Sequence, residues 1–425
     1  MRWTRAAGRG LLLLTLLLAG NAGANGRSEG TRSEREGRGP VTLATGRDLT
    51  GYLQPVLDAW NRTHPAERAT LVELPEAADE VHAQMVESLH SGSDRFDVLN
   101  IDVAWTSEFA GEGWIAPVDG RRLPLRQLLP SVVDTATFHG RLYAAPFVTN
   151  AGLLYYRKDI LDREGLKPPR TWAELESDAE RLAPKYHIGG YAGQFLPYEG
   201  LTANVVEAVQ SAGGSVLASE GARVTVDSPA AREALGFLAR GVRRGWIPRE
   251  ALTFKEEESR RAFENGELLF LRNWPYMYGL MSTPGSKVAH RFGAVPLPGP
   301  HGAGVSVLGG SDLAVNTHSR HPRTAADLLA YMTSERVQRQ VLTKGALPPV
   351  RAELYRDPAL IRRYPYLPVL EESVRTARPR PKSESYEQVS LAIAAVSQNA
   401  LTLHQPPEAA IARLRRELTL IVRSQ

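Results

Sequence analysis

The stretch Leu153–Leu175, LLYYRKDILDREGLKPPRTWAEL, contains the clearest order of structural signals in the chain. Residues 153–156 form an apolar run that predicts a buried strand, and a short helix follows it. A Gly-Leu step and a Pro-Pro step then interrupt the chain before Thr171 and Glu174, whose spacing predicts a capping box at the start of a second helix. A strand, a short helix and a capped helix therefore follow one another within this stretch.

Strands and helices also alternate before this stretch. Apolar residues at 41–44, 70–74 and 98–101 predict three strands, and apolar residues at helical spacing predict a helix in each interval. We expect Thr50 to cap the first of these helices and Gly92 to end the second. Such alternation predicts a mainly parallel sheet with right-handed crossovers, so a ligand is expected beyond the carboxyl ends of the strands.

The chain after this stretch continues the α/β pattern to its end. Its apolar spacing predicts helices over 201–210, 231–242, 325–342 and 411–421, strands over 268–271 and 313–315, and a loop over 296–304. We therefore expect two α/β lobes. The strand and helix between 313 and 342 could complete either one.

The N-terminus has the order of a secretory signal peptide. Arginines at 2, 5 and 9 precede an apolar run over 11–19 and the small residues 22–24. We expect a signal peptide over 1–24 and a disordered linker over 25–40, which is poor in apolar residues. The alternative is an uncleaved membrane anchor, but the run is shorter than the ~20 residues needed to span a bilayer. Asn21 stands where a bacterial lipoprotein carries its lipidated cysteine, so we expect a secreted, periplasmic or cell-surface protein without a lipid anchor there.

The composition excludes several classes of function. The 425 residues contain no cysteine and carry a formal net charge of +4, much of it in the leader, so we expect no disulfide and no nucleic-acid partner. No phosphate-binding loop, His-Glu-x-x-His motif or Gly-x-Ser-x-Gly elbow is present. His318 and His321 are expected in a surface turn, and neither a metal nor a cofactor is predicted.

Polar and aromatic side chains concentrate in the predicted loops. A neutral sugar offers hydroxyl groups and apolar C–H faces, so its site needs planar polar groups and flat aromatic walls. The candidates are Asp48 and Asp102 after two strands, Asn150 before the 153–156 strand, Gln194, Tyr198 and Glu199 in one loop, and Trp274 and Tyr276 in another. Structural roles remain open, since Trp274 could belong to the core, Asp102 could cap a turn and Glu199 could serve as a charge at a helix N-terminus.

In residues 153–175 the chain resembles the extracellular solute-binding proteins of carbohydrate ABC importers, which include the maltose-binding proteins. Other segments are similar to trehalose- and maltose-binding members: Tyr198–Thr202, Leu271–Tyr276, Val307–Gly310, Leu313–Asn316 and Arg378–Ser383. The resemblance implies a two-lobed periplasmic-binding-protein-like fold of type II with the ligand cleft between the lobes. The lobes implied are 41–146 plus 306–343 and 147–305 plus 344–425.

The resemblance also implies roles for individual residues. Asp102 matches a carboxylate that takes two sugar hydroxyls, and Asp48 matches the first loop more loosely. The other implied contacts are hydroxyl binding by Asn150, stacking on Trp274 and Tyr276, a backbone contact from Gly310, a hydrogen bond from Arg380, and Tyr198 and Glu199 near the cleft. Ser311 departs from related trehalose/maltose binders that carry Trp there, so trehalose, maltose, a longer oligosaccharide or a derivative all remain open.

The function implied is that of a monomeric, non-catalytic subunit that closes on a di- or oligosaccharide and delivers it to ABC permease subunits in the membrane. Two alternatives remain. One is a secreted glycosidase that uses Asp102 and Glu199 as its acid and base. The other is a receptor that senses sugar without transporting it.

Overall fold

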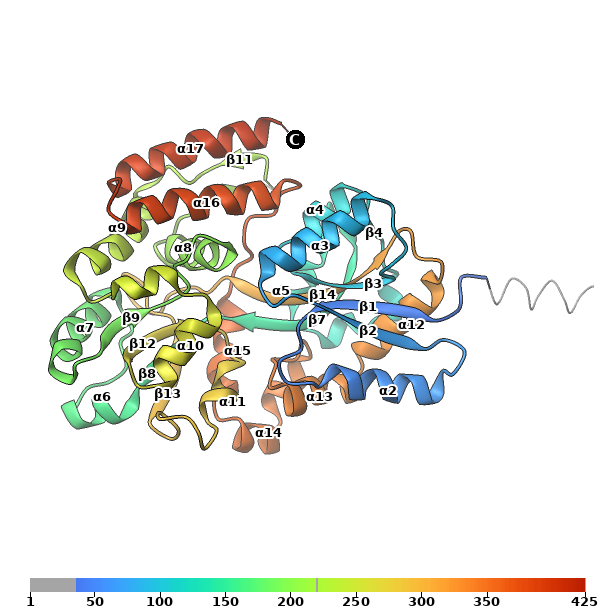
Figure 1. The fold of residues 1–425 in the computed structure, drawn as a ribbon, viewed down its shortest axis with the longest axis horizontal. Helices are drawn as coiled ribbons and strands as arrows, with labels where there is room; N and C mark the ends of the chain where they lie inside the picture. The colour runs from blue at the N-terminus through green and yellow to red at the C-terminus, as the bar shows by residue number, and fades with distance from the viewer. Residues whose placement is uncertain (1–35, 219–220, 425) are drawn as a thin grey trace, which may run out of the picture. The chain divides into compact units, whose positions relative to one another are not determined.

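The computed structural model describes residues 36–218 and 221–424. The signal peptide predicted for 1–24 and most of the linker predicted for 25–40 lie outside the described residues. From Arg38 onward the chain forms one compact unit, whose two larger β-sheets lie one in each of two lobes (Figure 1). Arg38, within the predicted linker, forms ion pairs with Glu67 and Asp327. In the described part of the chain, no helix combines the length and the apolar character that crossing a bilayer requires.

The first lobe contains a six-stranded sheet in the order β2-β1-β3-β14-β4. The sixth strand, β7, pairs with β14 along the edge that does not face β3. Its strands are β1 Val41–Gly46, β2 Ala69–Leu74, β3 Val98–Asp102, β4 Ile115–Ala116, β7 Ala144–Ala151 and β14 Leu308–Asn316. β1, β2 and β3 run parallel as predicted, whereas β14 is antiparallel to β3, β4 and β7. The strand predicted at 313–315 therefore belongs to this sheet.

Helices cover both faces of the first sheet (Figure 1). They are α2 Leu53–Thr63, α3 Ala78–His90, α4 Thr106–Gly111, α5 Pro130–Thr135, α12 Pro322–Met332 and α13 Glu335–Gly345. Because successive strand residues point to opposite faces, Leu43 and Leu313 pack with α2, α12 and α13, whereas Ala44 and Ala314 pack with α3 and α4. The sheet is thus buried on both sides, and polar groups reach solvent mainly at the ends of its strands.

Two local predictions were wrong. Thr50 does not cap α2, because the Asp48 carboxylate accepts hydrogen bonds from the backbone N–H groups of Thr50, Gly51 and Leu53 at 3.1, 2.9 and 2.8 Å. The helix predicted over 325–342 is two helices, α12 and α13. The chain leaves the helix after α12, and the hydroxyl of Ser334 caps α13.

The second lobe contains a four-stranded sheet in the order β13-β8-β12-β9. Its strands are β8 Leu153–Arg157, β9 Gly189–Ala192, β12 Leu268–Asn273 and β13 Phe292–Pro296. Apart from α12 and α13 of the first lobe, the α-helices that follow Gly152 are α6 Lys158–Glu164, α7 Trp172–Tyr186, α8 Glu199–Ser211, α9 Pro229–Arg244, α10 Glu256–Glu264, α11 Met277–Met281, α14 Pro358–Arg363, α15 Leu367–Thr376, α16 Tyr386–Leu401 and α17 Pro407–Arg423. Two short hairpins, β5–β6 (Thr137–Phe138, Arg141–Leu142) and β10–β11 (Leu217–Ala218, Arg223–Val224), complete the strands of the described chain.

The stretch 153–175 folds as predicted into β8, α6 and the start of α7. The capping box is confirmed, because the Thr171 hydroxyl accepts from the Glu174 N–H at 3.2 Å and the Glu174 carboxylate accepts from the Thr171 N–H at 3.0 Å. β8 follows β7 after the single residue Gly152, so this stretch begins where the chain leaves the first sheet for the second.

Candidate functional site: a cavity between the two lobes

A cavity of about 350 Å³ is lined by residues of both lobes. The first lobe contributes the carboxyl ends of β1 and β3 together with parts of β7 and β14, and the second lobe contributes the start of α8 and the segment after β12. Ten of the residues named from the sequence line this cavity, and Gln194 does not: the ten are Asp48, Asp102, Asn150, Tyr198, Glu199, Trp274, Tyr276, Gly310, Ser311 and Arg380. Ligands of open α/β sheets bind at such strand ends.

Arg380 connects the two lobes across the cavity. Its two terminal nitrogens donate to Asp102 at the end of β3 and to Glu199 at the start of α8. Glu199 also accepts hydrogen bonds from the hydroxyls of Tyr386 and Ser390. Arg380 and Glu199 are only 5% and 8% exposed, so each charge depends on the other for its stability. Burial raises the pKa of the Glu199 carboxyl, and the charge of Arg380 acts against that rise.

Three buried polar atoms of residues that line the cavity have no hydrogen-bond partner. They are the side-chain oxygens of Asn100 and Asn150 and the Nε of Arg380. An unpartnered buried polar atom costs about 1–3 kcal/mol.

Asn100 was not identified from the sequence, although a signal was present. Asn100 and Asp102 are two residues apart on β3, so their side chains lie on the same face of the strand. The amide of Asn100 donates to the Thr45 hydroxyl at 2.9 Å, which leaves its oxygen free. Polar alternation at the end of a predicted parallel strand would have suggested this residue.

Both aspartates named from the sequence also have turn-forming roles. Asp48 accepts three backbone hydrogen bonds at the start of α2, and Asp102 accepts one from the Ala104 N–H at 2.9 Å. Asp102 therefore caps a turn, as considered from the sequence, and also lines the cavity. Such bonds hold both carboxylates in fixed orientations.

Aromatic rings reach the cavity from both lobes. Trp274 is half-buried, and the Arg272 guanidinium lies 4.0 Å from its ring centroid. Tyr276 donates its hydroxyl to Glu257 at 2.9 Å, and Tyr198 donates to Glu256. Trp105 lines the cavity from the first lobe and was not named as a site residue. Rings with their polar ends already bonded offer apolar faces to a ligand.

The Gly309–Ser311 segment of β14 passes close to the cavity wall. Gly310 has φ of +119°, and a Cβ there would lie 2.1 Å from the carbonyl oxygen of Val148, so only glycine fits. A Cβ on Gly309 would meet the ring of Trp274 at 3.0 Å. Ser311 lies opposite Asp102 in the β14–β3 pair. The small Ser311 side chain leaves open the space that a larger residue would fill.

The wall of the cavity carries more acidic than basic groups. Five carboxylates line it, with two guanidinium groups: Asp48, Glu76, Asp102, Glu199 and Glu256 against Arg47 and Arg380. Asp312 lies buried near Asp102 with neither oxygen hydrogen-bonded. Burial and the charge of Asp102 raise the pKa of Asp312 well above its ordinary value. The cavity is thus unfavourable for an anion.

Gln194 does not reach the cavity, although the sequence made it a candidate. It is fully buried and bonds to Ser259, Asn204 and the guanidinium of Arg272. Arg272 in turn forms a buried ion pair with Glu207. Gln194 therefore belongs to a polar network inside the second lobe.

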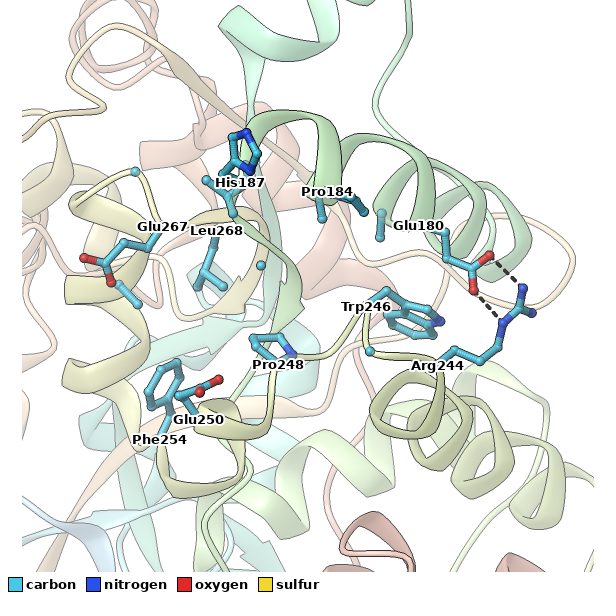
Figure 2. A pocket seen from close by; sticks show the side chains of 17 residues that line it. Glu180, Pro184, His187, Arg244, Trp246, Pro248, Glu250, Phe254, Glu267 and Leu268 are labelled. Carbon is cyan, nitrogen blue, oxygen red and sulfur yellow. Dashed lines mark hydrogen bonds and ion pairs between the residues drawn. The ribbon is translucent and has the colours of Figure 1, made fainter.

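A larger cavity of about 1050 Å³ lies entirely in the second lobe and contains none of the predicted site residues (Figure 2). Glu180 and Arg244 form an ion pair at its edge. Trp246 is only 2% exposed, so its ring gives a ligand little face to stack on. The smaller cavity between the lobes fits a polar ligand better, because aromatic rings and polar side chains from both lobes lie together there.

The chain is similar in sequence and in structure to bacterial solute-binding proteins. Residues 45–339 match the family described as bacterial extracellular solute-binding protein. The chain is 32% identical over 376 residues to a probable ABC transporter-binding protein of Deinococcus radiodurans, covering 86% of this chain and 89% of that one. It is 33% identical to the maltose-bound MalE3 of T. maritima, with a TM-score of 0.84 over 90% of this chain and 99% of that one.

A more distant structure supports the fold alone. It is an ABC transporter solute-binding protein of Thermotoga lettingae bound to α-D-tagatose, 23% identical to this chain, with a TM-score of 0.81 over 90% of this chain and all 100% of the other. The two-lobed α/β architecture is therefore common to chains with different bound sugars.

Proposed function

Because the chain belongs to the family of bacterial extracellular solute-binding proteins, we propose that it binds a small neutral saccharide in the cavity between its lobes and delivers it to an ABC permease. The observation that carries the proposal is one cavity in which aromatic rings from both lobes lie beside polar side chains that include Asp102, Asn150 and Arg380. Sugar hydroxyls would form hydrogen bonds with those polar side chains, and the C–H faces of the sugar would lie against Trp105, Trp274 or Tyr276.

The volume of the cavity supports a ligand of one or two sugar rings. About 350 Å³ lies near the lower end of the roughly 300–1000 Å³ typical of small-molecule sites. The maltose bound by the T. maritima relative is consistent with this size. Trehalose and maltose are therefore the ligands we would test first, followed by longer oligosaccharides.

We propose that the two lobes move as two bodies about the crossing segments, and that the first boundary lies at Gly152 instead of the expected residue 146, because β7 Ala144–Ala151 is paired within the first sheet. Closure would bring Asp102 of the first body to Arg380 of the second, which is the contact seen here. A monomer that closes in this way could present both lobes to the permease. Small-angle scattering with and without sugar tests the motion, and an unchanged radius of gyration in saturating ligand would contradict it.

The arrangement of charges argues against the glycosidase alternative. Asp102 and Glu199 share the guanidinium of Arg380, so neither carboxyl is free to protonate or attack a glycosidic bond. We expect no monosaccharide when the protein is incubated with trehalose or maltose. Steady release of glucose, lost on removal of Glu199, would instead support an enzyme.

Binding is tested by thermal denaturation and titration calorimetry with a panel of mono- and disaccharides. A bound sugar at a hundred times its dissociation constant should stabilise the fold by about 2.7 kcal/mol. Sugar phosphates of matched size serve as the control. If no neutral sugar shifts the melting temperature, the cavity does not serve saccharides. If deletion of the gene abolishes sugar uptake, the protein takes part in transport. If uptake is unchanged, the protein is a sensor.

A further inference from the structure

A charged cluster around His82 lies where the lobes contact each other outside the sugar cavity. His82 is on α3 of the first lobe and is only 3% exposed. Its Nε2 is 3.0 Å from Glu108 of α4, in the same lobe, and its Nδ1 is 3.7 Å from Glu387 of α16, in the second lobe (Figure 1). The two carboxylates lie at different nitrogens of the ring, so a protonated His82 interacts with both lobes at once.

The start of α16 reaches across to the first lobe. Val389, Ile393 and Val396 of this helix pack in the core of the second lobe, whereas Tyr386, its first residue, packs with α3 and α4. Residues 380–387 also form ion pairs with the first lobe: Arg380–Asp102, Lys382–Asp134, Glu384–His139 and Glu387–His82. Charges on this segment therefore help to hold the lobes together.

The burial of His82 comes from its own lobe. The centroid of the Trp105 ring lies 5.0 Å from that of His82, and the centroid of the Phe109 ring lies 5.6 Å away. Both rings pack with α3 in the core of the first lobe. Glu387, in contrast, has 49% of its side chain accessible. If the lobes separate, His82 therefore keeps the rings that bury it and loses Glu387.

The charges that face His82 favour its protonated form. They are Glu108 of α4, Glu387 of α16 and Asp79, one turn earlier on α3, and the charge of Lys255 acts on Asp79. Burial alone would lower the pKa of His82, but the hydrogen bond to Glu108 and the charges of the three carboxylates outweigh it and raise the pKa above its ordinary value of 6.5. Glu108 and Asp79 belong to the first lobe, so among these carboxylates only Glu387 comes and goes with closure.

A proton on His82 therefore favours the closed arrangement. In the closed state Glu387 adds to the attraction for this proton, so His82 holds it more tightly than in an open state. The attraction is fully present below the ordinary pKa of 6.5, where His82 is protonated in both states, and it is lost as the pH rises through the raised pKa.

We propose that the ion pair between protonated His82 and Glu387 makes lobe closure depend on pH, so that the chain binds its ligand more tightly at mildly acidic than at alkaline pH. This inference rests on the proposed function, because the ion pair acts on the closure that accompanies sugar binding. The ion pair between His139 and Glu384 has the same sign, but these side chains are 64% and 46% exposed, so we expect little effect from it.

The test is titration calorimetry of the full secreted chain with maltose at pH 6 and at pH 9. We expect the native chain to bind maltose about two- to fivefold more tightly at pH 6, as for an ion pair partly open to solvent. Glu387→Gln should bind about equally at both pH values. The matched control is Glu335→Gln, which also removes a charge from a helix start, at α13, but from a pair with Arg339 instead of a histidine. This control should keep the native pH dependence.

If Glu387→Gln binds maltose with the same pH dependence as the native chain, the proposal is overturned while the proposed function stands. Where His82→Gln folds, its maltose affinity should not respond to the further change Glu387→Gln. A response as large as in the native chain would show that Glu387 acts without His82.

A second measurement needs no ligand and separates this proposal from the proposed function. Between pH 6 and pH 9 the melting temperature of the native chain should fall further than that of Glu387→Gln, whereas Glu335→Gln should fall as far as the native chain. Equal falls in the native chain and Glu387→Gln would overturn the proposal even if no sugar binds.

Discussion

At the scale of single residues, the cavity between the lobes combines two kinds of contact. Trp274 supplies a half-buried ring, with the Arg272 guanidinium 4.0 Å from its centroid and the backbone of Gly309 close to its edge. Asp102, Glu199 and Arg380 supply charges that already satisfy one another. Substitutions at these positions should therefore separate ligand affinity from fold stability.

Trp274→Ala should weaken sugar binding by about tenfold or more, because the stacking face is removed. Trp274→Phe keeps a ring and should lose less. Calorimetry on both variants measures the difference, and matching circular dichroism spectra check that the fold is intact. Native affinity in Trp274→Ala would mean that the ring serves the core of the second lobe.

Arg380→Met should destabilise the protein by about 3–5 kcal/mol, since Glu199 would then keep a buried charge without its partner. The double variant Arg380→Met with Glu199→Gln should recover much of that loss. Urea unfolding of the single and double variants measures it. Additive losses would show that Arg380 and Glu199 do not depend on each other.

Asp312→Asn should raise the melting temperature at neutral pH. The raised pKa of Asp312 means that the folded state holds its proton more tightly than the unfolded state. The native chain therefore loses stability as pH rises above the ordinary aspartate range, near pH 4, toward the raised pKa. Melting curves from pH 4 to pH 8 should show a gain for the variant that disappears at the acidic end. A gain that does not change with pH would rule out titration of Asp312 as its cause.

At the scale of elements, β14 is the strand on which the first sheet and the cavity both depend. It pairs with β3, β4 and β7 and carries Gly310 at a positive φ against the carbonyl of Val148. β14 lies more than 150 residues after β7 in the sequence. Its backbone must therefore approach β7 closely for the sheet to close.

Gly310→Ala should cost about 1–3 kcal/mol, because alanine is strained at that φ and its Cβ would meet the Val148 carbonyl. Gly236→Ala is the matched control: it lies in α9, at a φ that alanine adopts readily, with open space around its Cβ. That variant should gain up to about 1 kcal/mol from helix propensity. Chemical denaturation compares the two, and an equal effect at both glycines would contradict the argument from β14.

At the scale of the whole molecule, function depends on the charge and closure of the cavity between the lobes. Its five carboxylates and two guanidinium groups favour a neutral ligand. We expect trehalose or maltose to bind at least a hundredfold more tightly than the same sugar carrying a phosphate, since the anion would be brought close to several carboxylates. Calorimetry in low and high salt measures both affinities. Comparable affinities for the sugar and its phosphate would show that the carboxylates do not discriminate against an anionic ligand.

The sequence by itself determined the α/β class, the positions of most strands and the capped start of α7. These features depend on the spacing of apolar residues and on hydrogen bonds between residues three or four apart, as in the Thr171–Glu174 box. It also named residues that line one cavity, although the resemblance to a family contributed much of that list. The end of α12 and the start of α13 at Ser334 were not predicted, because the helical spacing of apolar residues continues across them.

Only the tertiary structure decided how distant segments meet. The apolar spacing left open which lobe would receive 313–315, although the resemblance to a family implied the first, and β14 is paired with β3 of the first sheet. The bridge from Arg380 to Asp102 and Glu199, the unpartnered oxygen of Asn100 and the cluster around His82 join residues far apart in the chain. Their contacts arise from how the two lobes pack against each other, and no local spacing carries that information.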